Sequence, residues 1–135
     1  MPKGKRSTLI FEDGSKIWVN AGTRVVYPVV FANSEREIFV DGEIFLDVSF
    51  DTDRPFIVKS KEFKVEVLGT SFNLMAYEYD NIHHVVLVTG MVNIKSNHDD
   101  TKAMLSPNEM FLLENNTSHI QKVNVNEYIS WKTGM

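Results

Sequence analysis

Three sets of residues in this chain have side chains that could perform chemistry. Ser71 could act as a nucleophile, His83 and His84 could begin a metal site, and Glu43 with Asp47 could form a glycosidase carboxylate pair. A serine nucleophile needs a base and a strained elbow, a metal needs converging ligands, and glycoside hydrolysis needs two acids that face each other across the sugar. Whether those partners can meet depends on the elements that carry these residues.

Neither Ser71 nor the histidine pair lies in a pattern that supports its chemistry. Ser71 follows Gly69 and Thr70 outside any Gly-x-Ser-x-Gly elbow, so a bend or bulge is the better interpretation. Adjacent residues on a strand point to opposite faces, so His83 and His84 cannot both bind one metal without distortion. We expect them to be solvated histidines at a strand end, and we predict no metal site.

The carboxylate pair fails on distance. Glu43 and Asp47 share one face of a predicted strand, and a rise of about 3.3 Å per residue places them roughly 13 Å apart. This separation is too large for the known glycosidase geometries. We expect the two acids on a solvated or edge-facing strand. We therefore predict no catalytic residue, no cofactor and no enzymatic activity.

Length and composition point to one globular domain. The chain has 135 residues, of which 43% are hydrophobic and 24% are charged, and this is enough to form a buried core. Its net charge of -4 disfavours nucleic acid as a partner, because phosphate binding needs a basic surface. The chain has no cysteine, which excludes disulfides and thiolate metal sites. It also lacks an apolar run of the roughly 18 residues that a membrane helix requires.

Alternating hydrophobicity predicts strands along almost the whole chain. The pattern is clearest in residues 63–74, where Val65, Val67, Phe72 and Leu74 are predicted core residues on either side of a corner at residues 69–71. About ten to twelve short strands separated by frequent turns are typical of an all-β sandwich or jelly-roll-like fold. The only helical turn is predicted at residues 126–132.

Local turn chemistry predicts where several of these strands end. Asp13-Gly14 is typical of a hairpin turn. Pro28 indicates an edge strand or the end of a strand, because proline cannot donate a hydrogen bond to a neighbouring strand. Asp41-Gly42 predicts a second hairpin by default, and one continuous strand with a glycine bulge is the alternative.

Eight blocks of the sequence form a recognisable series. The blocks are DGSKIWVNAGT at residues 13–23 with Tyr27-Pro28, REI at 36–38, GEIFLDV at 42–48, RPFIV at 54–58, VEVLGTSFN at 65–73, VTGMV at 88–92, LSPNE at 105–109 and YISWK at 128–132. Together these blocks resemble the FecR-type regulators, the periplasmic parts of anti-sigma factors. They lie in family order, cover nearly the whole chain, and resemble the Bacteroidetes branch. The positions that carry the pattern are Asp13, Gly14, Trp18, Asn20, Gly42, Glu43, Pro55, Gly69, Thr70, Phe72, Asn73, Gly90 and Trp131.

Two positions depart from the family pattern. Asn108 stands where glycine is frequent, and we expect the turn to persist because asparagine tolerates a positive φ better than most residues. Leu46 stands where an aromatic residue is common, which should matter little inside a core.

The resemblance implies that residues 1–135 form a single FecR-type β domain excised from a longer, membrane-anchored regulator. Such regulators carry a cytoplasmic sigma-binding segment, one membrane helix, this β domain and often a small α/β domain after it. The domain would lie in the periplasm and link a TonB-dependent outer-membrane receptor to an extracytoplasmic-function sigma factor. Its partners would be the receptor's signalling domain and, through the missing segments, the sigma factor. Strand edges and loops would make these contacts.

Two other classes of function have their own structural signatures. A carbohydrate-binding β-sandwich module would display an exposed row of coplanar rings, and a cupin-type enzyme would need histidines converging on one metal. The candidate rings are Phe45, Phe72, Tyr77 and Tyr79. The four histidines are His83, His84, His98 and His119.

Overall fold

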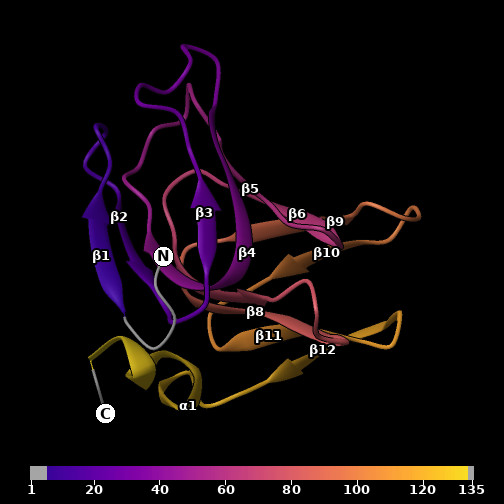
Figure 1. Ribbon diagram of the computed structural model, residues 1–135. Coiled ribbons are helices and arrows are strands. Elements are labelled where there is room, and N and C mark those ends of the chain that lie inside the picture. The colour runs from indigo at the N-terminus through magenta and orange to yellow at the C-terminus, as the bar shows by residue number, and fades with distance from the viewer. Residues whose placement is uncertain (1–5, 134–135) are drawn as a thin grey trace.

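Strands make up most of the computed structural model, which describes residues 6–133 (Figure 1). A short helical segment ends this range and consists of α1 (Asn126–Ile129) and the 3-10 turn η1 (Ser130–Thr133). The strands are β1 (Ser7–Ile10), β2 (Lys16–Val19), β3 (Arg24–Val26), β4 (Arg36–Asp47), β5 (Phe56–Lys59), β6 (Phe63–Val67), β7 (Ser71–Ala76), β8 (Ile82–Thr89), β9 (Val92–Ser96), β10 (Lys102–Leu105), β11 (Glu109–Glu114) and β12 (Thr117–Lys122). The all-β prediction with a C-terminal helical turn is confirmed.

The strands form two sheets that share β4. Sheet A consists of β1, β2, the second half of β4, β7, β8, β11 and β12. Sheet B consists of β3, the first half of β4, β5, β6, β9 and β10. β4 and β5 run parallel, and the other pairs are antiparallel. Because β10 also approaches β11, the combined sheet is nearly closed into a barrel (Figure 1).

β4 is one continuous strand, so the default prediction of a hairpin at Asp41-Gly42 was wrong and the continuous-strand alternative is correct. Residues before Gly42 pair with β3 and β5, and residues from Gly42 onward pair with β2 and β7. Gly42 has φ +143°, and a Cβ at this position would collide with the Thr23 side chain. The turn rule failed because a dipeptide does not reveal that both halves have partners far away in sequence.

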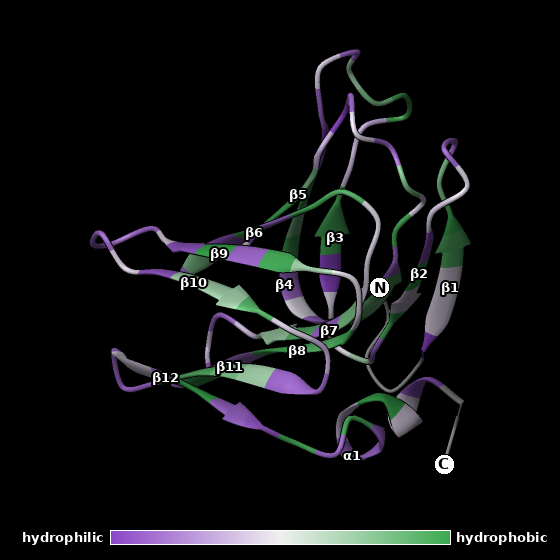
Figure 2. Ribbon diagram, turned by 180° about the vertical axis from the view of Figure 1, so that it is seen from behind, coloured by the Kyte–Doolittle hydropathy of each residue, from purple (hydrophilic) through white to green (hydrophobic). Residues whose placement is uncertain are grey.

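The hydrophobic core lies between the two sheets. Val65, Val67, Phe72 and Leu74 are all buried, as predicted. Apolar residues concentrate in the strands, whereas the β9–β10 and β11–β12 turns are hydrophilic (Figure 2). The largest fully buried apolar side chains are Phe56, Phe63, Phe72, Ile17, Ile38, Ile44, Leu46, Leu74, Leu87, Leu105 and Val40.

The corner at residues 69–71 is a bend that continues into an irregular strand pair, as predicted. The register of β7 with β8 shifts between Ser71 and Phe72. A Cβ on Gly69 would lie 2.7 Å from Phe50 Cδ2, and a Cβ on Gly90 would lie 2.8 Å from the Gly69 carbonyl oxygen. Three backbone segments therefore meet here at distances that only glycine allows.

Two further expectations concern the turn at Asn108 and the possibility of a membrane-spanning helix. Asn108 has φ +71°, which confirms that asparagine supports the turn where glycine is frequent. Among residues 6–133, no helix has the length and apolar character needed to cross a bilayer.

Candidate functional site

A chain of polar side chains lies on the outer face of sheet A, under the C-terminal helical segment. Trp131 Nε1 donates a hydrogen bond to Asn73 Oδ1 at 2.8 Å, and Asn73 Nδ2 donates to Glu43 Oε2 at 2.9 Å. The other carboxylate oxygen of Glu43 accepts a hydrogen bond from Asn20 Nδ2 at 2.9 Å. Because Asn73 is fully buried, its two bonds satisfy carboxamide atoms that water cannot reach.

Alternation along β4 places Glu43 in this network. Even-numbered residues from 36 to 46 face the core, so Glu43 and Phe45 project to the outer face. Glu43 was expected on a solvated or edge-facing strand, and this was wrong because β4 has neighbours on both sides and the C-terminal segment covers its outer face. Asp47 does lie exposed at the end of the same strand.

Aromatic and cationic side chains hold the helical segment against the same face. Lys132 Nζ lies 5.0 Å from the ring centroid of Trp18 and 4.9 Å from that of Phe45. The rings of Trp18 and Phe45 meet edge to face, with centroids 5.4 Å apart. Contacts of this kind contribute roughly 0.5–1 kcal/mol each at partly exposed sites. Together with the Trp131 hydrogen bond, they hold the helical segment in place on sheet A.

His84 is sealed under the helical segment rather than solvated, so that expectation was also wrong. Its ring packs edge to face on Tyr128 of α1, with centroids 5.3 Å apart. Burial, followed by the nearby His83, lowers the pKa of His84 to about 4. His84 is therefore neutral at physiological pH. The sequence offered no signal for this burial, because the covering residue lies 44 positions away (128 minus 84).

His83 points to the opposite face of β8, as the strand geometry predicts. It is buried beside Phe63 of sheet B, with ring centroids 6.2 Å apart, and its Nε2 lies 3.0 Å from the Asp80 carbonyl oxygen. His98 pairs with Glu62, while His119 lies exposed near Gln121. The four histidines therefore do not converge, and residues 6–133 contain no group of three or more potential metal ligands.

The start of the described chain is joined directly to its helical end. The Arg6 guanidinium donates a hydrogen bond to the Trp131 carbonyl oxygen. Figure 1 and Figure 2 show β1 beside the helical segment in both views. The residue that anchors the C-terminal segment to Asn73 thus also contacts the segment that leads into β1.

A second cluster surrounds Arg36, a buried cation. Arg36 lies in the REI block, but the sequence did not mark it as a site residue. Its Nη1 lies 2.8 Å from Asp13 Oδ2, and its backbone N–H donates to the Pro55 carbonyl at 2.8 Å. Burial raises the pKa of Asp13, but the hydrogen bonds from Arg36 and Ser15 outweigh this and hold that pKa below its usual value. This pair connects the β1–β2 turn, which contains Gly14, to the β4–β5 connection.

A third cluster occupies the glycine corner. Thr70 Oγ1 donates a hydrogen bond to the Met91 carbonyl at 3.0 Å, and Gly90 packs on the backbone of Gly69. A groove of about 460 Å³ opens beside it and exposes Phe50, Leu68 and Met91, of which Phe50 is 74% accessible. Most of the predicted family positions thus fall into three groups: the outer face of sheet A, the Arg36 cluster and this corner. Gly42 at the bend of β4 and Phe72 in the core lie outside these groups.

The geometry does not assemble a catalytic or sugar-binding site from the sequence candidates. Ser71 Oγ donates a hydrogen bond to Asp47 Oδ1 at 3.1 Å. Phe45 and Phe72 are buried, and the rings of Tyr77 and Tyr79 are tilted by 43° rather than coplanar. Among the described residues, the arrangement is instead suited to holding segments of chain in place.

Comparison with known proteins decides the family. The model of the FecR protein family matches residues 1–93. The chain belongs to the FecR family. Two crystal structures of a protein from Parabacteroides distasonis described as an anti-sigma factor, at 1.65 Å and 2.50 Å resolution, match with a TM-score of 0.92 and 31% sequence identity. A search of curated proteins found no match.

The FecR match gives a regulatory context to the site. Each structural match covers 99% of this chain and 63% of the Parabacteroides protein, so the chain spans less than two thirds of these relatives. FecR membership and the structural match together support an anti-sigma regulatory role. The resemblance identified from the sequence blocks is confirmed.

Proposed function

We propose that this chain is the periplasmic signal-relay domain of a FecR-type anti-sigma regulator. In this role it links a TonB-dependent outer-membrane receptor to an extracytoplasmic-function sigma factor through protein–protein contacts and without enzymatic activity. The main support is the match over 99% of the chain to a protein described as an anti-sigma factor. The greater length of that relative supports the proposal that residues 1–135 are one domain of a longer protein. The membrane anchor of that longer protein is part of the proposal.

The hydrogen-bonded outer face of sheet A supplies a physical route for the relay. Trp131 joins the end of the domain to the sheet through Asn73 and to the segment before β1 through Arg6. A partner that displaced the helical segment would break both contacts at once. It would also expose the buried carboxamide of Asn73, which makes the change unfavourable unless the partner supplies binding energy.

The proposal is tested with the intact regulator, with all of its periplasmic segments present. The signalling domain of the receptor encoded beside it should retain the regulator in a pull-down, and the receptor's ligand should induce sigma-dependent transcription. The variant Trp131→Phe removes the Nε1 donor while keeping an aromatic ring, and it should change the induction ratio without reducing protein abundance. Loss of capture with the wild-type regulator would contradict the proposed function.

A further inference from the structure

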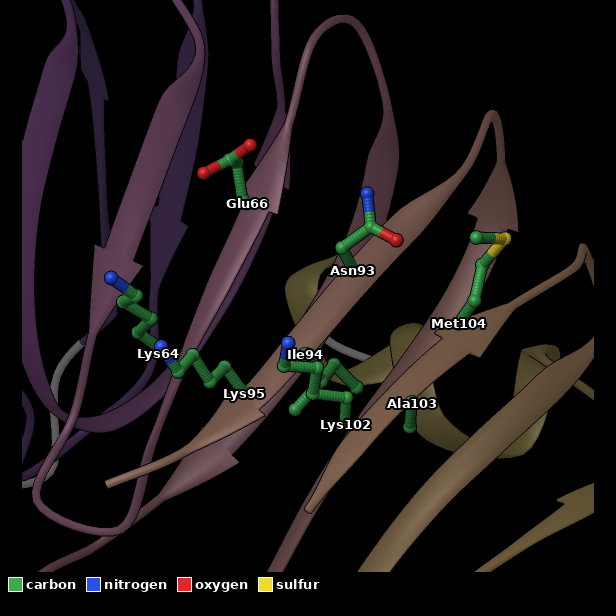
Figure 3. A pocket seen from close by; sticks show the side chains of 8 residues that line it. All are labelled: Lys64, Glu66, Asn93, Ile94, Lys95, Lys102, Ala103 and Met104. Carbon is green, nitrogen blue, oxygen red and sulfur yellow. The ribbon is translucent and has the colours of Figure 1, made fainter. Parts of the chain in front are cut away.

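The outer face of sheet B carries a row of lysines. Lys64 on β6 pairs directly with Lys95 on β9, which in turn pairs with Lys102 on β10. Lys59 on β5 extends the row opposite Lys64, but Glu37 neutralises it at 3.2 Å. Figure 3 shows the first three side chains following one another across neighbouring strands. The row is therefore a feature of the tertiary structure, since its members are spread over 39 residues of sequence (102 minus 64, plus one).

The stability of the folded chain does not explain why these three lysines lie side by side. None of the ion pairs between described residues involves Lys64, Lys95 or Lys102. Like charges directly opposite each other on neighbouring strands are destabilising. A single lysine on an edge strand can block unwanted strand pairing, and this would account for Lys102 on β10. It does not account for the other two, because β6 and β9 both have neighbours on each side.

The row borders a hollow with an apolar part. The hollow measures about 570 Å³ and is lined by the three lysines together with Glu66, Asn93, Ile94, Ala103 and Met104. Met104 is 59% accessible, although it is a large apolar side chain. Figure 3 shows Glu66, Asn93 and Met104 as a second row beside the lysines. A ligand for this face needs negative charge on one side and an apolar group next to it.

The charge around the row limits the size of that ligand. Glu66 lies two residues after Lys64, and Asp99 and Asp100 form part of the turn that precedes Lys102. The whole chain carries a net charge of -4. A nucleic acid or an anionic bilayer extends beyond the row and meets Asp99 and Asp100 as well as Glu66. A short acidic peptide segment laid along the lysines meets Glu66 alone among these carboxylates.

The spacing of the three lysines favours a helical segment over an extended one. Neighbouring strands lie about 4.8 Å apart, so three lysines in register repeat at about that interval. Side chains one helical turn apart are separated by about 5–6 Å. Alternate residues of an extended chain are separated by about 6.7 Å. A helix that crosses the strands therefore aligns three successive carboxylates with the lysines better than an extended chain does.

We propose that the outer face of sheet B binds an acidic amphipathic helix of a protein partner. Carboxylates one turn apart pair with Lys64, Lys95 and Lys102, and an apolar side chain of the same helix covers Met104. This inference deepens the proposed function and rests on it, because a relay domain requires a partner surface. It assigns that surface to the face opposite the C-terminal segment rather than to a strand edge.

The probe is a fluorescent helix-forming peptide of about 20 residues with glutamates one turn apart and leucines beside them. Its affinity for the chain is measured by anisotropy at two salt concentrations. Combining Lys64→Gln, Lys95→Gln and Lys102→Gln should weaken binding by roughly tenfold or more, because three charge pairs are lost. The control combines Lys61→Gln with Lys122→Gln, two exposed lysines outside the row, and should weaken binding far less than the triple substitution does. Circular dichroism establishes that both variants are folded.

A charge exchange keeps the test specific. Lys95→Glu should abolish binding of the acidic peptide, and a peptide with lysine at the central glutamate should restore part of it. The proposal would be overturned if the triple-glutamine variant and its double-glutamine control bound the peptide equally. It would also be overturned if a peptide of the same composition with scrambled order bound as tightly as the designed peptide. Tighter binding of a single-stranded oligonucleotide or of phosphatidylglycerol vesicles at the same row would also overturn it. Failure here with intact receptor capture leaves the proposed function standing, whereas loss of capture with intact peptide binding contradicts the proposed function itself.

Discussion

The two outer faces of the molecule are built in opposite ways. On sheet A, the C-terminal helical segment covers Asn73, Glu43 and His84. Asn73 and Glu43 are hydrogen-bonded within the protein, whereas His84 Nδ1 has no partner among the described residues. On sheet B, Lys95 and its neighbours lie uncovered, opposite one another and without carboxylate partners among the described residues. The first face holds the domain's own chain. The second has the charge pattern that we propose for binding an acidic partner.

This difference shows that a buried polar network and an exposed charged row affect the stability of the fold in different ways. The network on sheet A is stabilising only while every member stays paired, so it behaves as a latch on the C-terminal segment. The row on sheet B opposes folding slightly and becomes favourable when negative charge arrives. Substitutions on the two faces should therefore change stability in opposite directions.

The largest effect is expected for Asn73→Ala. This substitution leaves Trp131 Nε1 and a Glu43 carboxylate oxygen without their partner, and it should lower the free energy of unfolding by about 4 kcal/mol. Urea denaturation followed by tryptophan fluorescence measures it. The matched control is Asn93→Ala on the outer face of sheet B, where the side chain is exposed and the expected change is below about 0.5 kcal/mol. Equal effects at the two asparagines would remove the distinction between the faces.

A somewhat smaller effect should appear as a dependence of stability on pH. The pKa of His84 is lowered from 6.5 to about 4 in the folded protein, so the unfolded chain binds the additional proton between these values. Stability that is fully present above pH 6.5 should therefore decline as the pH falls towards about 4, by up to about 3 kcal/mol from this group.

Two histidine variants isolate this contribution. His84→Leu should flatten the part of the pH profile between pH 6.5 and about 4, measured as urea midpoints across that range. His119→Leu should leave the slope as it is, because His119 lies exposed on β12. A wild-type slope no steeper than that of His84→Leu would mean that the helical segment does not seal this side chain.

The smallest effect should be a gain in stability on sheet B. Lys95→Gln removes the charge at the centre of the row and should raise the free energy of unfolding by about 0.5 kcal/mol at low ionic strength. The gain should shrink as salt is added, because exposed charges are screened. Thermal unfolding of this variant beside Lys122→Gln measures the difference. A loss of stability would mean that Lys95 makes a favourable contact within the domain.

Much of the architecture was accessible from local pattern alone. Alternation over residues 63–74 identified Val65, Val67, Phe72 and Leu74 as core, because period two is a property of the extended backbone itself. The bend at residues 69–71, the helical turn near the C-terminus and the positive φ of Asn108 follow from equally local preferences. The family was recognisable for the same reason, since its blocks are short runs of sequence.

Only the tertiary structure decided what lies over and beside those strands. Gly42 was expected to close a hairpin, yet it bends one strand between two sheets because its partners come from distant segments. His83 and His84 were expected in solvent, yet they are buried because Phe63 and Tyr128 pack on them. Strand pairing also aligned three lysines from separate segments. Local sequence determines which face a side chain takes, and non-local packing determines what that face meets.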